Sequence, residues 1–387
     1  MAGNGLSEVA VREALKGVVD PVVAQSIVEA GYVKSVAVSG ARVRVAIELP
    51  TPAHAAKGAL AEAIEGAVKR VAGVSGVDID WSWDVVARGG PVAIGRAEGG
   101  AQPVHAGPQL GGAGAIAEPR MASVKNIIAV ASGKGGVGKS TVAANLALAL
   151  RSFGARVGLL DADIYGPSQP TMLGAVGVTP SVTEDKKMLP VEVYGVQMMS
   201  IGFFLGRANA VVWRGPMVGK MIQQFVEDTV WGRLDYVVVD LPPGTGDAQL
   251  SLTQLIPLAG AVMVTTPQEV ALIDVLKAMD MFKKVNVPVL GIVENMSGFA
   301  CPKCGHHEAI FNAGGGEQAA RDEKVPFLGR VPLVTEIREG GDAGRPVTVT
   351  APDSAAAKAF RDVACRVAGE LAKANLAKRA LPVLTIT

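Results

Sequence analysis

The stretch from Ser132 to Thr141, SGKGGVGKST, constrains this chain more than any other. It fits the pattern G-x-x-x-x-G-K-[ST], in which glycines allow backbone N–H groups to curl around phosphate oxygens. An apolar, strand-like run over residues 126–131 precedes it, and a helix-forming run over residues 141–150 follows it. A helix that begins here points its free N–H donors at the loop. The stretch therefore predicts a phosphate-binding loop between a strand and a helix.

The pattern of the loop also predicts separate roles for its lysine and its serine. Lys139 would contact the β- and γ-phosphates of a bound nucleotide, and Ser140 would bind magnesium. The nucleotide expected is ATP with Mg²⁺. The predicted nucleotide ligands within the loop are Gly133, Lys134, Gly135, Gly136, Val137, Gly138, Lys139, Ser140 and Thr141.

After the loop, short apolar runs alternate with helical patterns. The apolar runs cover residues 157–160, 236–239, 261–264 and 289–293, and a helix is predicted over residues 268–285. Strands that are apolar on both faces are typical of a parallel sheet covered by helices. We therefore predict an α/β fold with a doubly wound, mostly parallel sheet, in which ligands bind beyond the carboxyl ends of the strands.

Acidic residues follow two of these predicted strands. Asp161 and Asp163 follow the run over residues 157–160, and Asp240 follows the run over residues 236–239. A carboxylate directly after an apolar strand is the Walker-B arrangement, which orients magnesium. We assign Asp240 to the magnesium site with support from Asp161, and we assign Asp163 to positioning or deprotonating the attacking water.

The length of 387 residues predicts two domains. Residues 1–88 read as a small α/β unit with a helix capped by Ser7, a hairpin that turns at Ser39 and Gly40, a helix over residues 53–71 and a final strand. Residues 89–122 are predicted to be a linker, because 21 of the 34 are Gly, Ala or Pro. Residues 123–387 would form the ATPase domain.

Composition limits the partners and the location. Lys and Arg number 37 against 36 Asp and Glu, a balance that argues against strong nucleic-acid binding. No apolar run approaches about 18 residues, so no membrane-spanning helix is expected. Three cysteines are too few for a disulfide framework, which favours a reducing, cytoplasmic location. Cys301 and Cys304 are then candidate metal ligands.

A second lysine, Lys134, makes the phosphate loop unusual, because a cation at this place suggests contact with phosphates bound by another subunit. With Lys134 the loop resembles the deviant Walker A motif of the ParA/MinD and nitrogenase-iron-protein class, whose members form ATP-sandwich homodimers. Residues 161–168, 240–247 and 294–297, together with Cys301-Pro-Lys-Cys304, resemble the Mrp/ApbC-type iron-sulfur cluster carrier ATPases more specifically.

This resemblance implies a function and its site residues. Lys134, Lys139 and Asp163 would serve slow ATP hydrolysis, and Asn295 would contact the adenine. Cys301 and Cys304 of two subunits would hold one [4Fe-4S] cluster at the homodimer interface, which agrees with the four thiolates that such a cluster needs. The implied partners are cluster-assembly scaffold proteins and apo iron-sulfur proteins, with no nucleic acid and no membrane.

The N-terminal unit shows a resemblance of its own. Asp20-Pro21, followed by residues 27–33, is similar to the small iron-sulfur assembly domain that is often fused to Mrp-type proteins. Many relatives carry an acidic residue at the place of Val22 and a cysteine at the place of His54. These differences argue against a cysteine-based role for this unit.

Several alternatives stay open at this point. Zinc is a rival for the cysteine pair, because Cys-Pro-x-Cys-Gly is a common zinc-knuckle turn that His306 and His307 follow here; the pair could also bind no metal. A ParA/MinD-type positioning ATPase would bind DNA or a membrane, and an electron-transferring reductase like the nitrogenase iron protein would also hold a bridging cluster. The helical run over residues 353–377 has an apolar stripe that is more typical of core packing than of membrane binding. Cys365, within that run, is predicted to be a buried small hydrophobic residue.

Overall fold

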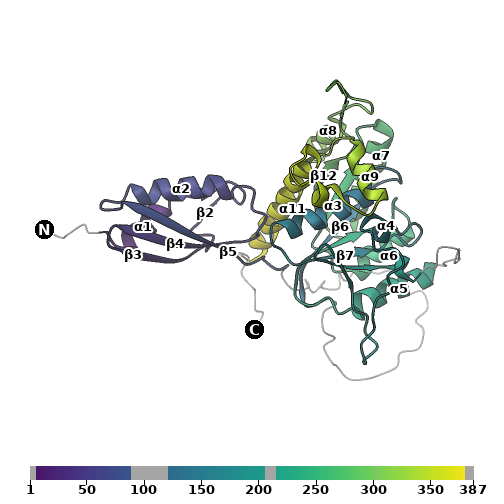
Figure 1. The fold of residues 1–387 in the computed structure, drawn as a ribbon, viewed down its shortest axis with the longest axis horizontal. Coiled ribbons are helices and arrows are strands. Elements are labelled where there is room, and N and C mark those ends of the chain that lie inside the picture. The colour runs from purple at the N-terminus through teal and green to yellow at the C-terminus, as the bar shows by residue number, and fades with distance from the viewer. Residues whose placement is uncertain (1–5, 89–120, 205–214, 302, 380–387) are drawn as a thin grey trace, which may run out of the picture.

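The structure is a computed structural model that describes residues 6–88, 121–204, 215–301 and 303–379. A small α/β unit at the N-terminus lies beside a larger α/β unit, and the C-terminal helix α11 (Ala355–Arg379) runs close to the junction (Figure 1). Almost all of the predicted linker, residues 89–122, lies outside the described residues.

The small unit contains the elements that its sequence predicts. Helix α1 (Glu8–Leu15) begins at Ser7, whose Oγ accepts a hydrogen bond from the Ala10 N–H at 3.2 Å. Strands β3 (Val33–Ser39) and β4 (Arg42–Leu49) form the hairpin, and Gly40 takes the left-handed φ of +60° that its turn requires. Helix α2 (Lys57–Lys69) is shorter than predicted at both ends, and β5 (Gly76–Trp83) pairs in parallel with β4. Two short strands, β1 (Val19–Asp20) and β2 (Gln25–Ser26), pair with each other.

The larger unit is built on an eight-stranded sheet in the order β15-β12-β11-β6-β10-β7-β9-β8. Every neighbouring pair is parallel except β8 and β9. The strands are β6 (Val124–Ala131), β7 (Val157–Asp161), β8 (Val191–Val193), β9 (Val196–Ser200), β10 (Leu234–Asp240), β11 (Gly260–Thr265), β12 (Val289–Glu294) and β15 (Phe327–Arg330). The predicted doubly wound, mostly parallel sheet is thus confirmed.

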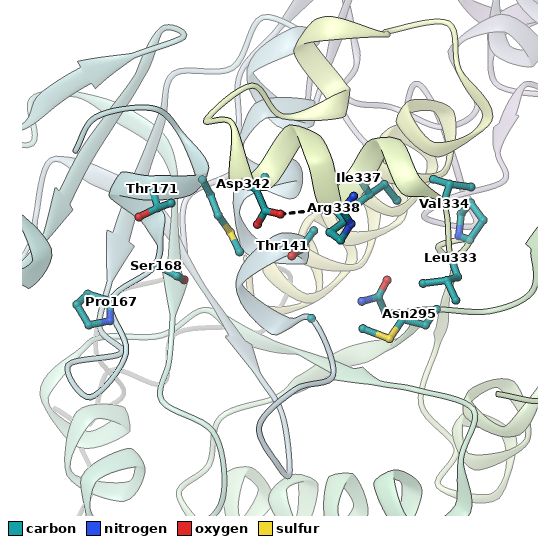
Figure 2. A pocket seen from close by; sticks show the side chains of 15 residues that line it. Thr141, Pro167, Ser168, Thr171, Asn295, Leu333, Val334, Ile337, Arg338 and Asp342 are labelled. Carbon is teal, nitrogen blue, oxygen red and sulfur yellow. Dashed lines mark hydrogen bonds and ion pairs between the residues drawn. The ribbon is translucent and has the colours of Figure 1, made fainter. Parts of the chain in front are cut away.

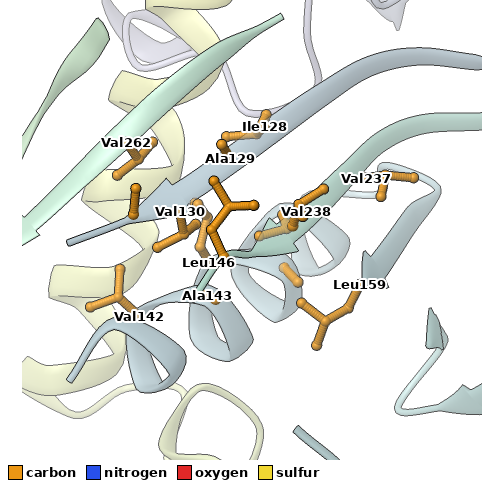
Figure 3. Close-up of a cluster of buried hydrophobic side chains, with 14 of the residues drawn as sticks. Ile128, Ala129, Val130, Val142, Ala143, Leu146, Leu159, Val237, Val238 and Val262 are labelled. Carbon is orange, nitrogen blue, oxygen red and sulfur yellow. The ribbon is translucent and has the colours of Figure 1, made fainter. Parts of the chain in front are cut away.

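Helices pack against this sheet and bury its apolar side chains. Helix α3 (Lys139–Ser152), which follows the phosphate loop, lies against the central strands, with Ala143 and Leu146 facing Val130 and Val238 (Figure 3). The other helices are α4 (Gln169–Met172), the 3₁₀ helix η1 (Ile201–Phe203), α5 (Gly215–Glu227), α6 (Asp247–Leu255), α7 (Glu269–Lys284), α8 (Gly315–Asp322), α9 (Thr335–Asp342) and α10 (Val347–Thr350). The predicted helix over residues 268–285 corresponds to α7.

The apolar stripe of α11 is part of the core, as predicted. Phe360, Val363, Val367 and Leu371 are each at most 1% exposed, and α11 packs against α3 and β15. This stripe is therefore not free to lie on a lipid surface. Cys365 is partly buried against the same core, and burial raises the pKa of its thiol to about 11. No helix within the described residues is long and apolar enough to cross a membrane.

The two units touch through buried hydrogen bonds. The Tyr236 hydroxyl, on β10, donates to Thr51 Oγ1 at 3.0 Å. The backbone carbonyl of Val86 accepts from the side-chain amides of Asn126 and Asn375, each at 3.0 Å. These contacts join the loop after β4 and the segment after β5 to the core of the larger unit.

Candidate functional site

The phosphate loop lies between β6 and α3, at the carboxyl edge of the sheet. Gly136 and Gly138 both have a φ of +82°, a conformation that residues with a Cβ rarely adopt. A Cβ on Gly138 would lie 2.1 Å from Asn295 Nδ2, and one on Gly133 would lie 2.1 Å from the backbone carbon of Asp274 in α7. Gly136 and Gly138 are therefore needed for the left-handed backbone conformation. Gly133 and Gly138 are needed because neighbouring atoms leave no room for a Cβ.

Lys139 lies among the predicted carboxylates. Its Nζ is 2.5 Å from Asp240 Oδ1 and 3.4 Å from Asp163 Oδ2, and it also donates to Ser140 Oγ at 3.3 Å. The side chains of Lys139 and Asp240 are at most 6% exposed. Lys134 is half-buried and forms no ion pair within the described part of the chain. The two lysines of the loop therefore occupy different electrostatic environments.

The third acidic residue, Asp161, is fully buried at the end of β7. Its carboxylate accepts hydrogen bonds from Ser200 Oγ at 2.9 Å and from the Asp163 and Gln169 N–H groups at 3.2 Å. Burial, and next the charge of Asp240, raise the pKa of Asp161 to about 7. Burial also raises the pKa of Asp163, although Lys139 opposes this shift. The cluster thus holds more negative charge than its one lysine can balance.

These residues fit a magnesium ion. The excess negative charge and the oxygen donors of Ser140 and Asp240 suit Mg²⁺, which proteins usually bind through one or two carboxylates, with phosphates and water completing the shell. No three His, Cys, Asp or Glu side chains in the described ranges are grouped as a complete metal site. Ser140 and Asp240 are therefore the residues that would hold a magnesium ion.

Gln169 belongs to this cluster, although the sequence analysis did not single it out. Its side chain is fully buried, and Nε2 donates both to the Ser140 carbonyl at 3.0 Å and to Asp240 Oδ2 at 2.8 Å. Its Oε1 is buried without a hydrogen-bond partner. Gln169 thus ties the first turn of α3 to the Walker-B carboxylate.

A cavity of about 430 Å³ opens beside the phosphate loop (Figure 2). Its walls are largely apolar, and Asn295 lies at its edge, where Nδ2 donates to the Val137 carbonyl at 2.8 Å. A largely apolar cavity with one amide at the edge suits a planar base. The residues that line it are Gly138, Thr141, Pro167, Ser168, Thr171, Met172, Asn295, Met296, Pro332, Leu333, Val334, Ile337, Arg338, Gly341 and Asp342.

The two candidate metal-binding cysteines lie at the tip of a short hairpin. Strands β13 (Phe299–Ala300) and β14 (His307–Glu308) pair antiparallel, and the Cys301 N–H donates to the His306 carbonyl at 2.8 Å. Neither cysteine forms a disulfide in the structure, and Cys304 is exposed. Backbone N–H groups of Lys303 and Cys304 lower the pKa of the Cys301 thiol, which favours the thiolate that binds metals.

The described residues of the hairpin do not form a complete metal site by themselves. The hairpin offers two thiols, and the residues described contain no third His, Cys, Asp or Glu grouped with them as a metal ligand. His306 and His307 are exposed, and His307 lies on β14 rather than at the tip. A complete zinc site within one chain is therefore not formed by these residues.

The small unit contains a buried polar cluster of its own. Asp20 Oδ2 lies 3.0 Å from His54 Nε2 and accepts a hydrogen bond from the Tyr32 hydroxyl at 3.0 Å, while Oδ1 accepts from the Val22 N–H. Burial works to raise the pKa of Asp20, but the bonds from His54, Val22 and Tyr32 outweigh it, so the pKa lies below its usual value. His54 is thus the partner of a buried carboxylate rather than an exposed ligand.

The fold and the site together define a P-loop nucleoside triphosphatase with a second lysine in its loop. More specifically, the chain belongs to the family of NUBPL iron-transfer P-loop NTPases, whose model matches residues 123–368. A model of the iron-sulfur cluster assembly protein domain matches residues 8–80. Membership of this family confirms the predicted resemblance and the predicted ATPase class.

Known proteins resemble the chain over different lengths. The iron-sulfur cluster carrier protein of Deinococcus radiodurans is 44% identical over 97% of this chain and 99% of its own length. That of Escherichia coli K12 is 54% identical over 66% of this chain and 69% of its own length. A nucleotide-binding protein of Archaeoglobus fulgidus, solved in complex with ADP, superposes with a TM-score of 0.53 and 41% identity over 58% of this chain and 89% of its own.

Proposed function

We propose that this protein is an ATP-hydrolysing iron-sulfur cluster carrier that binds a [4Fe-4S] cluster between two copies of itself and transfers it to apo-proteins. The observation that carries the proposal is the Cys301–Cys304 pair, without a disulfide, at a hairpin tip in a chain of the iron-transfer NTPase family. The names of the relatives from Deinococcus radiodurans and Escherichia coli support it. We infer a cytoplasmic location from the sequence, because three cysteines are too few for a disulfide framework.

The proposed homodimer follows from two incomplete features. The hairpin supplies two thiols where a [4Fe-4S] cluster takes four, and a two-fold axis would supply the other two. Lys134 has no ion-pair partner within the described residues, and phosphates bound by the second copy would provide one. We propose scaffold proteins as donors and apo iron-sulfur proteins as acceptors, without nucleic acid or membrane.

We propose that the loop and the acidic cluster carry out ATP hydrolysis. Ser140 and Asp240 would hold Mg²⁺, which neutralises developing phosphate charge when bound. Lys139, now paired with Asp240, would turn to the β- and γ-phosphates, and Asp163 would position the attacking water. Asp161 would support Asp163, since it already accepts a hydrogen bond from the Asp163 N–H. Asn295 would contact the adenine at the edge of the cavity.

Cluster transfer is the experiment that tests this proposal. The full chain, reconstituted anaerobically, is mixed with an apo-ferredoxin, and the acceptor's absorbance and iron content are followed with and without Mg-ATP. We expect transfer by the wild type and none by Cys304→Ala, whereas Cys365→Ala should behave as wild type. A protein that reduces a bound partner but keeps its cluster would instead support the electron-transfer alternative.

A further inference from the structure

The end of strand β12 lies between the nucleotide cavity and the cysteine hairpin. Four consecutive residues, Glu294 to Ser297, leave the strand here. Asn295 (Figure 2) and Met296 line the cavity beside the phosphate loop, whereas the Glu294 side chain bonds to Ser297, before the hairpin, and to Gly314 and Gly316, after it. One short stretch of backbone therefore contacts both sites.

Glu294 forms hydrogen bonds to the chain on both sides of the cysteine hairpin. Its side chain is fully buried, and Oε1 accepts hydrogen bonds from Ser297 Oγ at 2.5 Å and from the Gly314 N–H at 3.0 Å. Its Oε2 accepts from the Gly316 N–H at 2.6 Å. Ser297 lies before the hairpin, and the two glycines lie after it, at the start of α8. Arg330 Nε also lies 3.5 Å from Glu294 Oε1. A single carboxylate thus closes the base of the segment that contains Cys301 and Cys304.

The nucleotide side of the same stretch is equally constrained. Asn295 Nδ2 donates to the Val137 carbonyl at 2.8 Å, and the Asn295 N–H donates to the Thr265 carbonyl at 2.8 Å. Met296 has a φ of +56°, a left-handed conformation that is strained for a residue with a Cβ. A rotation that relieved Met296 would move the neighbouring residues with it, because the peptide units between them are planar.

We propose that Glu294 is a positioning residue. It couples nucleotide binding in the cavity beside the phosphate loop to the conformation of the cysteine hairpin. A nucleotide that contacts Asn295 and Met296 shifts the end of β12. Glu294 transmits this movement through its hydrogen bonds to the residues before and after the hairpin. The role of this coupling in cluster transfer rests on the proposed function. The coupling itself can be tested in the metal-free protein.

Alkylation of the metal-free full chain reports on the hairpin directly. Iodoacetamide labelling of Cys301 and Cys304 is timed with and without Mg-ADP, and peptide mass spectrometry separates both from Cys365. In the wild type we expect Mg-ADP to change the labelling rate about fivefold or more, the lower end of typical coupling between sites. In Glu294→Gln, which keeps the shape but not the charge, the ratio of the two rates should fall to about one.

Two further variants separate positioning from a general loss of structure. Ser297→Ala removes the hydrogen bond before the hairpin and should reduce the Mg-ADP effect even if Glu294→Gln folds poorly. Glu323→Gln is the matched control, because Glu323 follows α8 and pairs with Lys283, whereas Arg330 pairs with both Glu294 and Glu317. The affinity for Mg-ADP should stay within about threefold of wild type in all three variants, a change of under 1 kcal/mol.

The outcomes are distinct. A ratio near one in Glu294→Gln, with wild-type behaviour in Glu323→Gln and retained ADP affinity, supports the link. A wild type whose labelling ignores Mg-ADP, or a Glu294→Gln protein that keeps the full effect, overturns it. Absence of iron from the reconstituted wild type would refute the proposed carrier function and leave this result standing.

Discussion

Replacing each lysine of the phosphate loop by alanine should have different consequences in the nucleotide-free protein. Lys139 is buried between Asp240 and Asp163, whereas Lys134 is half-buried and unpaired within the described residues. Lys139→Ala leaves three neighbouring carboxylates, counting Asp161, without their cation. Lys134→Ala removes no ion pair from the described structure.

The structure sets the size of each effect. Removing one partner of a buried, hydrogen-bonded ion pair costs about 3–5 kcal/mol, whereas a surface substitution usually stays within about 0.5 kcal/mol. For a unit of this size the first value corresponds to a fall in Tm of roughly 6–20 °C. Lys139→Ala should also weaken ADP binding about tenfold or more, because it removes a charge-assisted hydrogen bond to phosphate. Lys134→Ala should bind ADP normally yet lose hydrolysis.

Calorimetric melting of the nucleotide-free proteins, fluorescent-ADP titration and phosphate release measure these three quantities. Equal melting temperatures of the two variants, or a loss of ADP affinity in Lys134→Ala as large as in Lys139→Ala, would contradict these separate roles. Loss of hydrolysis alone does not distinguish the two lysines, since both are placed in the reaction.

Three further predictions concern buried groups. Asp20→Asn should destabilise the small unit by on the order of 1–3 kcal/mol in urea unfolding at pH 7. Because the pKa of Asp20 is lowered in the folded state, the difference in unfolding free energy from wild type should be full above about pH 5. This difference should shrink as the pH falls below about 4. Gly138→Ala should weaken ADP binding more than tenfold by titration, through its left-handed φ and the collision with Asn295. Gln169→Leu leaves Asp240 Oδ2 without its amide donor and should lower kcat/KM for ATP by roughly 5- to 150-fold, or about 1–3 kcal/mol, with unchanged labelling of the cysteines as the control.

The central strands could be predicted because they are buried on both faces and read as continuous apolar runs. The edge strands could not. Strand β15 has only four residues, one of them Gly329 with a φ of +138° and another the half-exposed Arg330, so it lacks the apolar run of a central strand. Strand β9 is equally hard to predict, because its five residues, Val-Gln-Met-Met-Ser, do not form a continuous apolar run.

The site residues differ in the same way in how well the sequence predicts them. The phosphate loop, Asp161 and Asp240 could be found because each lies in a short pattern next to a strand. Gln169 could not, because its amide reaches Ser140, 29 residues away, and Asp240, 71 residues away. The pairing of His54 with Asp20, 34 residues apart, is equally invisible to a local pattern. Such contacts depend on the tertiary fold, and only the structure brings them together.

The central claim, one cluster shared by two copies of the chain, is tested most directly by metal analysis of the full chain. Protein reconstituted anaerobically is analysed for iron and zinc, and its mass is measured in solution with and without ATP. We predict a brown dimer with about two irons per chain, because a four-iron cluster is shared between two copies, and loss of the iron in Cys301→Ala. A colourless protein with stoichiometric zinc, or an iron-free monomer, would contradict it.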